Sequence, residues 1–71
     1  MKLNEVVDVV SSNIKSVAYD EGNLYVVYKS GAMYKYKDVK EEVYKELLSA
    51  ESKGRYMNSN IKGKYLYEKV A

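Results

Sequence analysis

The chain has 71 residues, of which 46% are hydrophobic and 31% charged, with a formal net charge of +2 and neither cysteine nor histidine. This apolar content is too high for an intrinsically disordered chain, and the length leaves room for one domain. The missing cysteine and histidine exclude a disulfide framework, thiolate metal sites and the usual base at neutral pH.

The beginning of the chain contains a lone basic residue, Lys2, followed by acidic residues instead of a long apolar run. This is unlike a signal peptide or a membrane span, so we expect a cytoplasmic protein that does not contact a membrane. Proline, Gly/Ser linkers and repeats are absent from the sequence. We therefore interpret residues 1–71 as a single domain.

The first half of the sequence predicts strands. Residues 6–10 carry valines on both sides of Asp8 and fit either a short strand or a helical turn. Residues 14–19 alternate in polarity, residues 20–23 have strong turn chemistry, and residues 24–29 form the next strand. These patterns predict an antiparallel hairpin.

The second hairpin has two possible registers. A two-residue loop at positions 30–31 would put Lys35 and Lys37 on the same face as the aliphatic residues of the preceding strand. A three-residue loop at positions 29–31, with Gly31 left-handed in a bulge, separates the lysines from that face. We prefer the three-residue loop, because a slip of one residue in the strand pairing would move every inward side chain to the outer face. It places five residues inward: Leu24, Val26, Tyr28, Tyr34 and Tyr36.

The outer face of this hairpin is then unusually apolar. Beside its lysines, it carries Tyr25, Val27 and Met33. Apolar side chains gathered on an exposed face are typical of an interaction surface. We expect a partner, a second copy of the chain or the C-terminal segment to cover it.

The clearest helix lies in DVKEEVYKELLSA, residues 38–50. Asp38 and Glu41 have the spacing of a capping box, which predicts where the helix begins. An apolar stripe at helical spacing should pack on the sheet; it consists of Val43, Tyr44, Leu47 and Leu48.

Beyond this helix, Gly54 and Gly63 interrupt the pattern. We expect a turn or a short second helix at residues 56–61, and residues 65–70 alternate as a last strand. The prediction is an α+β fold in which a small antiparallel sheet, in β-β-β-α-(α)-β order, is packed by one main helix.

Several segments together resemble the KTSC domain family: SSNI, SVAYD, LYVVYKSG, YKY, Val39 and SKGRYMNSNIKGKY, spanning residues 7–70. Many members place proline where this chain has Lys40, which changes only how the helix begins. The family occurs as a C-terminal appendage of some lysyl-tRNA synthetases and as stand-alone bacterial and phage proteins. The resemblance therefore implies a fold and suggests RNA binding, and it implies no active site.

Catalysis has little support in the residues. Without histidine and cysteine, only carboxylates, lysines and serines remain as reactive groups. Asp20 and Glu21 lie in a turn without further acids at calcium-loop spacing, and SKGR lacks the flanking glycine of a phosphate-binding loop. We expect a protein that is not an enzyme and that has no cofactor and no metal.

Binding has more support, because cations and aromatic rings are interleaved. From residue 52 onward the sequence contains five basic residues and one acidic residue, and this excess of positive charge suits contact with phosphates. Single-strand binders place rings for base stacking beside such cations. The same tyrosines could instead fill the core of a small domain. The candidate nucleic-acid or ligand-binding residues are Tyr34, Tyr36, Lys53, Arg55, Tyr56, Lys62, Lys64 and Tyr65.

Two other classes of function use the same residues. A homo-oligomer could enclose a nucleotide at its interface with these tyrosines and Arg55. Alternatively, the domain could dock on another protein through the outer apolar face. RNA or another single-stranded nucleic acid is the partner that we prefer.

Overall fold

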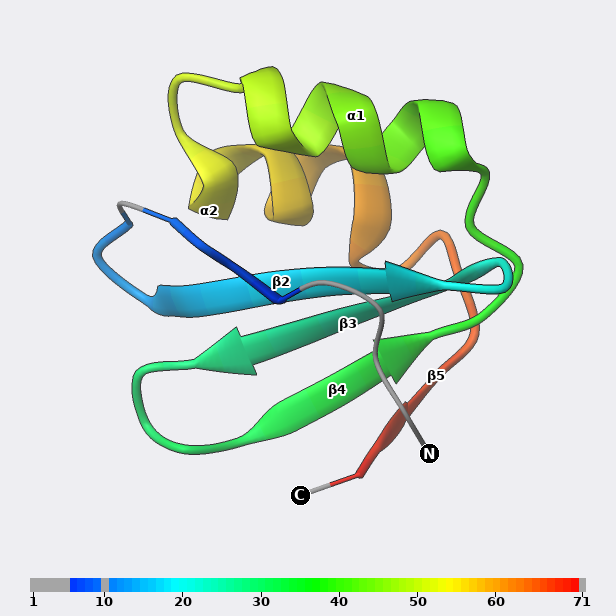
Figure 1. Ribbon diagram of the computed structural model, residues 1–71, viewed down its shortest axis with the longest axis horizontal. Helices are drawn as coiled ribbons and strands as arrows, with labels where there is room; N and C mark the ends of the chain where they lie inside the picture. The colour runs from blue at the N-terminus through cyan, green and yellow to red at the C-terminus, as the bar shows by residue number, and fades with distance from the viewer. Residues whose placement is uncertain (1–5, 10, 71) are drawn as a thin grey trace.

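The computed structural model describes residues 6–9 and 11–70 (Figure 1). Five strands pair in chain order in one antiparallel sheet: β1 (Val6–Asp8), β2 (Ile14–Asp20), β3 (Asn23–Tyr28), β4 (Met33–Tyr36) and β5 (Tyr67–Lys69). Three helical segments lie between β4 and β5 along the chain and cover one face of the sheet: α1 (Glu41–Ser49), α2 (Lys53–Tyr56) and the π-helical segment η1 (Met57–Ile61).

The predicted α+β class is confirmed, with one strand more than the predicted order. Positions 6–8, which the sequence left open between a strand and a helical turn, form β1 and pair with β2. Position 10 lies outside the described residues. The expected short second helix is also present, but it begins earlier, at Lys53, because the Ser52 hydroxyl accepts a hydrogen bond from the Arg55 amide.

The turn between β2 and β3 lies where the sequence predicted it. Glu21 and Gly22 both have positive φ angles, of 48° and 83°. Two successive left-handed residues are the signature of a type I′ turn, whose twist matches that of the flanking strands.

The register of the second hairpin is the preferred one of the two alternatives. Leu24 pairs with Tyr36 and Val26 with Tyr34, and the Tyr28 amide donates to the Ala32 carbonyl over 2.8 Å. Gly31 has a φ of 99°, as the bulged loop requires. The tyrosines of β4 therefore face the helices.

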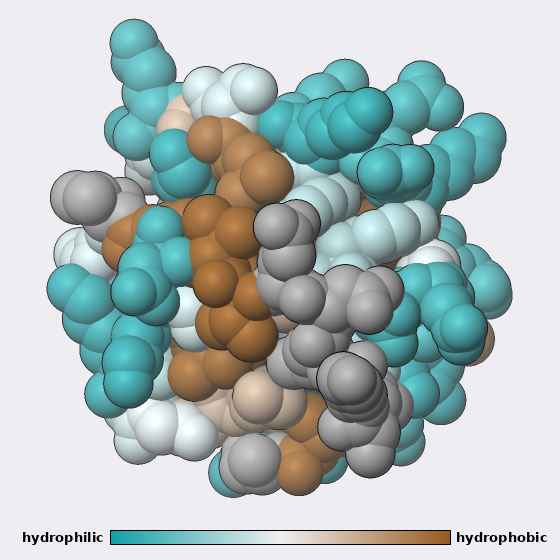
Figure 2. Space-filling view, viewed as in Figure 1, coloured by the Kyte–Doolittle hydropathy of each residue, from teal (hydrophilic) through white to brown (hydrophobic). Residues whose placement is uncertain are grey.

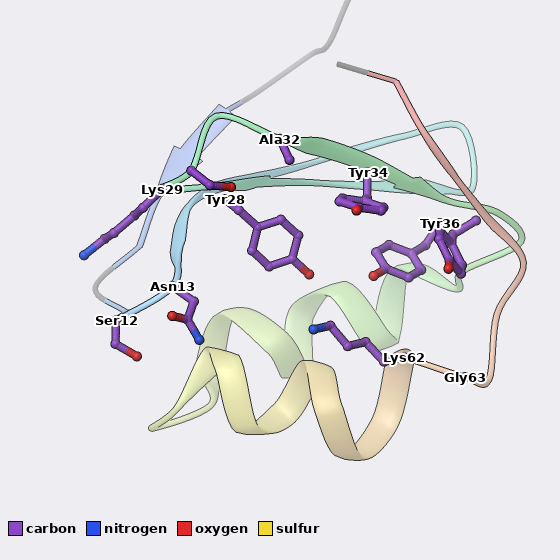
Figure 3. Close-up of a pocket in the computed structure, with 11 residues that line it drawn as sticks. Ser12, Asn13, Tyr28, Lys29, Ala32, Tyr34, Tyr36, Lys62 and Gly63 are labelled. Carbon is purple, nitrogen blue, oxygen red and sulfur yellow. The ribbon is translucent and has the colours of Figure 1, made fainter.

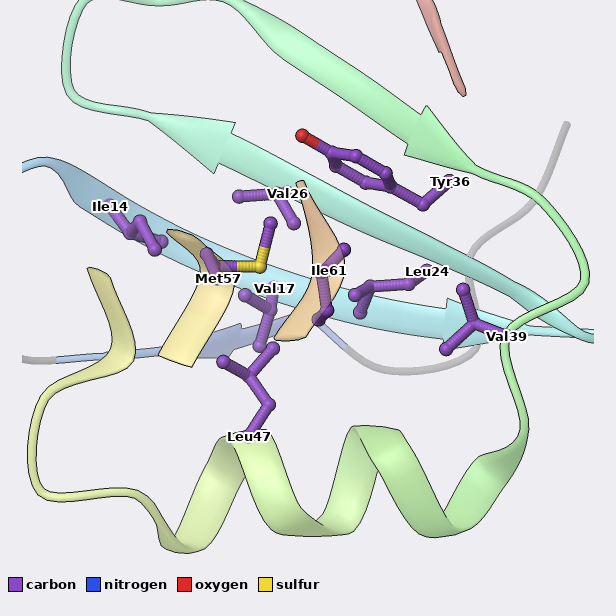
Figure 4. Packing of buried hydrophobic residues seen from close by; sticks show 9 residues of the cluster. All are labelled: Ile14, Val17, Leu24, Val26, Tyr36, Val39, Leu47, Met57 and Ile61. Atoms are coloured by element: carbon purple, nitrogen blue, oxygen red, sulfur yellow. The ribbon is translucent and has the colours of Figure 1, made fainter. Parts of the chain in front are cut away.

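The core lies between the sheet and the helices (Figure 4). Leu47 projects from α1 toward the sheet, and Met57 and Ile61 enter the same cluster from η1. All three are buried. The predicted helix stripe is confirmed, because its other members, Val43, Tyr44 and Leu48, pack against this cluster.

The predicted capping box is wrong. Asp38 has a φ of 57°, and α1 begins at Glu41 with Lys40 as its N-cap, which makes no side-chain capping bond. The cause is Val39, which is buried and whose backbone amide and carbonyl both form hydrogen bonds. Its amide donates to the Gly22 carbonyl over 2.8 Å, and its carbonyl accepts from the Tyr19 hydroxyl.

Part of the outer face of the sheet is covered within the chain itself. Tyr25 is only 2% exposed, so it is not open to a partner, and its neighbours Ser16 and Ala18 are buried as well. Figure 2 shows where apolar surface is visible: a strip of apolar side chains runs down the middle of the view, with hydrophilic side chains along its left side. Val6 in β1 is 56% exposed.

Replacing Leu47 with alanine should lower the free energy of unfolding by about 2–5 kcal/mol, because it leaves a cavity where α1 meets the sheet. Chemical denaturation measures the loss. A loss below about 1 kcal/mol would mean that α1 does not pack on the sheet in solution as it does here.

Replacing Gly31 with valine should cost more stability than replacing the adjacent Ser30 with valine. A Cβ at position 31 would meet no atom within 4 Å, so the cost comes from the left-handed backbone alone. That cost is about 1–2 kcal/mol or more for a β-branched residue. Equal thermal unfolding midpoints for the two variants would contradict the three-residue loop.

Candidate functional site

A pocket of about 710 Å³ lies between the β3–β4–β5 part of the sheet and the C-terminal end of η1 (Figure 3). Four tyrosines line it: Tyr28, Tyr34, Tyr36 and Tyr67. Lys62 and Gly63, which follow η1, form the opposite wall. We call this the tyrosine pocket.

Strand pairing brings the four tyrosines together. Tyr34 and Tyr36 alternate on the inner face of β4, and Tyr67 of β5 pairs directly with Tyr36. Tyr28 lies at the end of β3, where the chain enters the bulged loop. The aliphatic core ends at this side of the sheet, so the rings border the pocket.

The rings form one contiguous aromatic cluster. Tyr28 and Tyr34 meet edge to face with centroids 5.6 Å apart, and Tyr67 lies 5.7 Å from Tyr34 and 5.6 Å from Tyr36. These are ordinary distances for aromatic pairs in contact. A planar ligand therefore has to stack on the outside of the cluster. Tyr67 offers the surface for this, because it is 57% exposed.

The hydroxyl groups of Tyr28 and Tyr36 point toward one another in the pocket (Figure 3). Burial first, and then a hydrogen-bonding contact with the neighbouring Tyr28 hydroxyl, raise the pKa of Tyr36 well above its ordinary value. The buried Tyr28 oxygen nevertheless has no partner at full hydrogen-bond geometry among the described residues. A buried hydroxyl left unpaired costs about 1–3 kcal/mol.

The charge of the pocket is positive. Lys62 holds its ammonium group 5.6 Å from the centroid of the Tyr28 ring, a cation–π distance, and Lys29 lines the rim. The described residues that line the pocket include no carboxylate. The arrangement suits a ligand that combines a flat ring with negative charge.

The pocket unites three of the eight candidate residues: Tyr34, Tyr36 and Lys62. Tyr36 is both core and pocket wall, since it is 3% exposed and belongs to the hydrophobic cluster. The sequence had presented these two roles as alternatives.

The other five candidates do not line the pocket: Lys53, Arg55, Tyr56, Lys64 and Tyr65. Two of them have structural contacts. The Lys53 ammonium donates to the Ala50 carbonyl over 2.7 Å, and the Tyr56 hydroxyl donates to the Glu46 carboxylate over 2.6 Å. Arg55 and Lys64 are exposed, and Tyr65 is half-buried against the core.

Sequence reasoning missed several pocket residues, notably Tyr28, Tyr67, Lys29 and Asn13. Tyr67 carried a usable signal, because it alternates with Tyr65 in the predicted last strand. Locating it beside Tyr36 requires the register between β4 and β5, which the sequence pattern did not supply.

The described part of the chain lacks the features of a metal centre and of a membrane-spanning helix. No group of three or more acidic, histidine or cysteine side chains gathers there in a way that could hold a metal ion. None of the described helices combines the length and apolarity needed to cross a membrane.

Residues 10–65 match the family model of the KTSC domain, so the chain belongs to the KTSC domain family. The crystal structure of a KTSC domain protein from Yersinia pestis is similar, with a TM-score of 0.89 and 35% identity, covering 94% of this chain and 97% of that one. The fold is thus that of a known KTSC domain.

Relatives identified by sequence are of two kinds. A protein of Tsukamurella paurometabola is 41% identical over 59 residues, covering 80% of this chain and 88% of that protein. A lysine–tRNA ligase of Nostoc punctiforme is 36% identical over 62 residues, which are 84% of this chain and only 11% of the ligase. The domain therefore occurs in small proteins and within a much larger one.

Stability should fall as the pH rises from about 10 to about 12. Burial, followed by the hydrogen bond to Glu46, raises the pKa of Tyr56 from 10.0 to about 12. A raised pKa stabilises the fold below the unfolded value, and this contribution disappears as the pH passes the folded value. Urea denaturation across this range should show a smaller decline for Tyr56→Phe. An identical decline in both proteins would show that Tyr56 does not contribute.

Proposed function

We propose that this protein binds single-stranded RNA. One base would bind in the tyrosine pocket, and lysines at the edges of the pocket would contact the neighbouring phosphates. The observation that supports this most directly is the contiguous cluster of four tyrosine rings beside Lys62, without a carboxylate among the described lining residues. Base–aromatic stacking contributes about 1–3 kcal/mol per base, and cations that follow the backbone add salt-dependent affinity.

We expect two lysines to contact phosphates on either side of a bound base. Lys29 lines the rim near the β3–β4 loop, and Lys64 follows Gly63, which lines the opposite wall. Both side chains are exposed. Lys62 is exposed as well, but its ammonium group lies over the Tyr28 ring, so we assign it to the base.

Comparison with relatives supports RNA over DNA. The lysine–tRNA ligase, an enzyme named for an RNA substrate, contains a region similar to most of this chain. An RNA-contacting domain would be useful both within such an enzyme and by itself.

Free nucleotide capture is the second candidate, because the pocket volume of about 710 Å³ is within the usual range for small-molecule sites. One version of this candidate is a homo-oligomer in which two copies of the chain enclose the nucleotide. Native mass measurement with and without uridine monophosphate tests this form. Affinity that does not grow with oligonucleotide length would favour capture over strand binding.

Changing Lys29 and Lys64 together to glutamine should weaken binding of a labelled oligouridine at low salt. The slope of log affinity against log salt should flatten by about 1–2 units, roughly one for each phosphate that a lysine no longer neutralises. Thermal unfolding should change little, because exposed charges contribute little stability. Fluorescence anisotropy over a salt series measures the affinity and its slope, and a thermal melt measures the stability.

Lys45→Gln is the matched control, since Lys45 is an exposed lysine on α1 that does not line the pocket. It should leave the slope unchanged. Arg55→Gln locates the strand independently. If that variant flattens the slope and the double variant does not, RNA runs over α2 and the pocket is not the site.

A further inference from the structure

The floor of the tyrosine pocket presents an unpaired polar group to a ligand. The Tyr28 oxygen is buried, yet it lacks a hydrogen-bond partner of full geometry in the described chain. Its ring is fixed from two sides, by the Tyr34 ring edge to face and by the Lys62 ammonium over its face. A ligand atom that bonds to this hydroxyl would remove the cost of leaving it unpaired.

The described residues that line the pocket around this hydroxyl include two lysines and no charged acceptor. An ammonium such as that of Lys62 can only donate. The Tyr36 hydroxyl points toward Tyr28, and its raised pKa keeps it protonated. The described lining residues contain no carboxylate that could accept from a ligand's amino group.

Bases differ in what they offer to such a set of donors. Uracil and guanine present ring carbonyl oxygens, which accept hydrogen bonds. Adenine has ring-nitrogen acceptors but no carbonyl group, and its exocyclic amino group would face the Lys62 ammonium without an acidic acceptor nearby. Stacking by itself would not produce this preference, because every base has a π-face.

We propose that the tyrosine pocket selects a base that carries ring carbonyl groups, uracil or guanine, over adenine, through hydrogen bonds donated by Tyr28 and Lys62. This selectivity rests on the proposed RNA binding and specifies what that site recognises. The Tyr36 hydroxyl points toward that of Tyr28, and the exposed ring of Tyr67 supplies the stacking surface.

The test compares oligouridine, oligocytidine and oligoadenosine of equal length by fluorescence anisotropy at one salt concentration. Oligouridine should bind about fivefold or more tightly than oligoadenosine, which is the factor for one hydrogen bond of ordinary strength. Cytosine keeps the ring size of uracil but replaces one carbonyl with an amino group, so oligocytidine should also bind more weakly than oligouridine.

Two variants connect the preference to the named groups. Tyr28→Phe removes only the hydroxyl and should bring uridine and adenosine oligomers to within about twofold of each other. The protein should stay folded, because the hydroxyl has no partner at full hydrogen-bond geometry among the described residues. Lys62→Gln adds an amide oxygen that can accept from adenine, so it should shift the preference toward adenosine. Tyr65→Phe removes a hydroxyl outside the pocket and should leave the preference unchanged.

The possible outcomes separate the two proposals. If oligonucleotides bind but adenosine binds as tightly as uridine, or if Tyr28→Phe keeps the full uridine preference, the selectivity is overturned and RNA binding stands. If no oligonucleotide binds, the proposed function is overturned and the selectivity falls with it.

Discussion

The bulged loop between β3 and β4 is the constraint on which the rest of this structure depends. Gly31 adopts a left-handed φ of 99°, and this geometry pairs Val26 with Tyr34 and Leu24 with Tyr36. Because side chains alternate along a strand, a loop shorter by one residue would turn both tyrosines away from the helices and replace them with lysines. The core and the tyrosine pocket would be lost together.

Tyrosine is suited to the double task that follows from this register. In a domain of this size, large side chains have to supply much of the buried apolar surface. Tyr36 contributes its ring to the core, whereas its hydroxyl reaches the pocket and points toward that of Tyr28. The same rings that stabilise the fold thus make a wall of the pocket without a separate loop to carry it.

The pocket joins parts of the chain that are distant in sequence. The β3–β4 hairpin supplies Tyr28 and Tyr34, the end of η1 supplies Lys62, and β5 supplies Tyr67. The helical segments between them bring the chain back across the sheet. The family match over residues 10–65 includes all of these elements except β5.

The sequence by itself determined the features that depend on local geometry. The turn at Glu21 and Gly22, the loop at Gly31 and the apolar stripe through Leu47 follow from backbone preferences and periodicity within a few residues. The resemblance to the KTSC family was carried by these same segments, and the family match confirmed it.

Only the tertiary structure decided the rest, because it depends on contacts between residues far apart in the chain. Asp38 does not form the predicted capping box. Instead, the burial of Val39 and the hydrogen bonds of the Val39 backbone with Gly22 and Tyr19 determine where α1 begins. The basic residues of the last third cannot be told apart by their sequence pattern. In the structure, the Lys62 ammonium lies over the Tyr28 ring, whereas the Lys53 ammonium donates to the Ala50 carbonyl. Local pattern cannot distinguish such lysines, since their roles depend on which distant side chain each one meets.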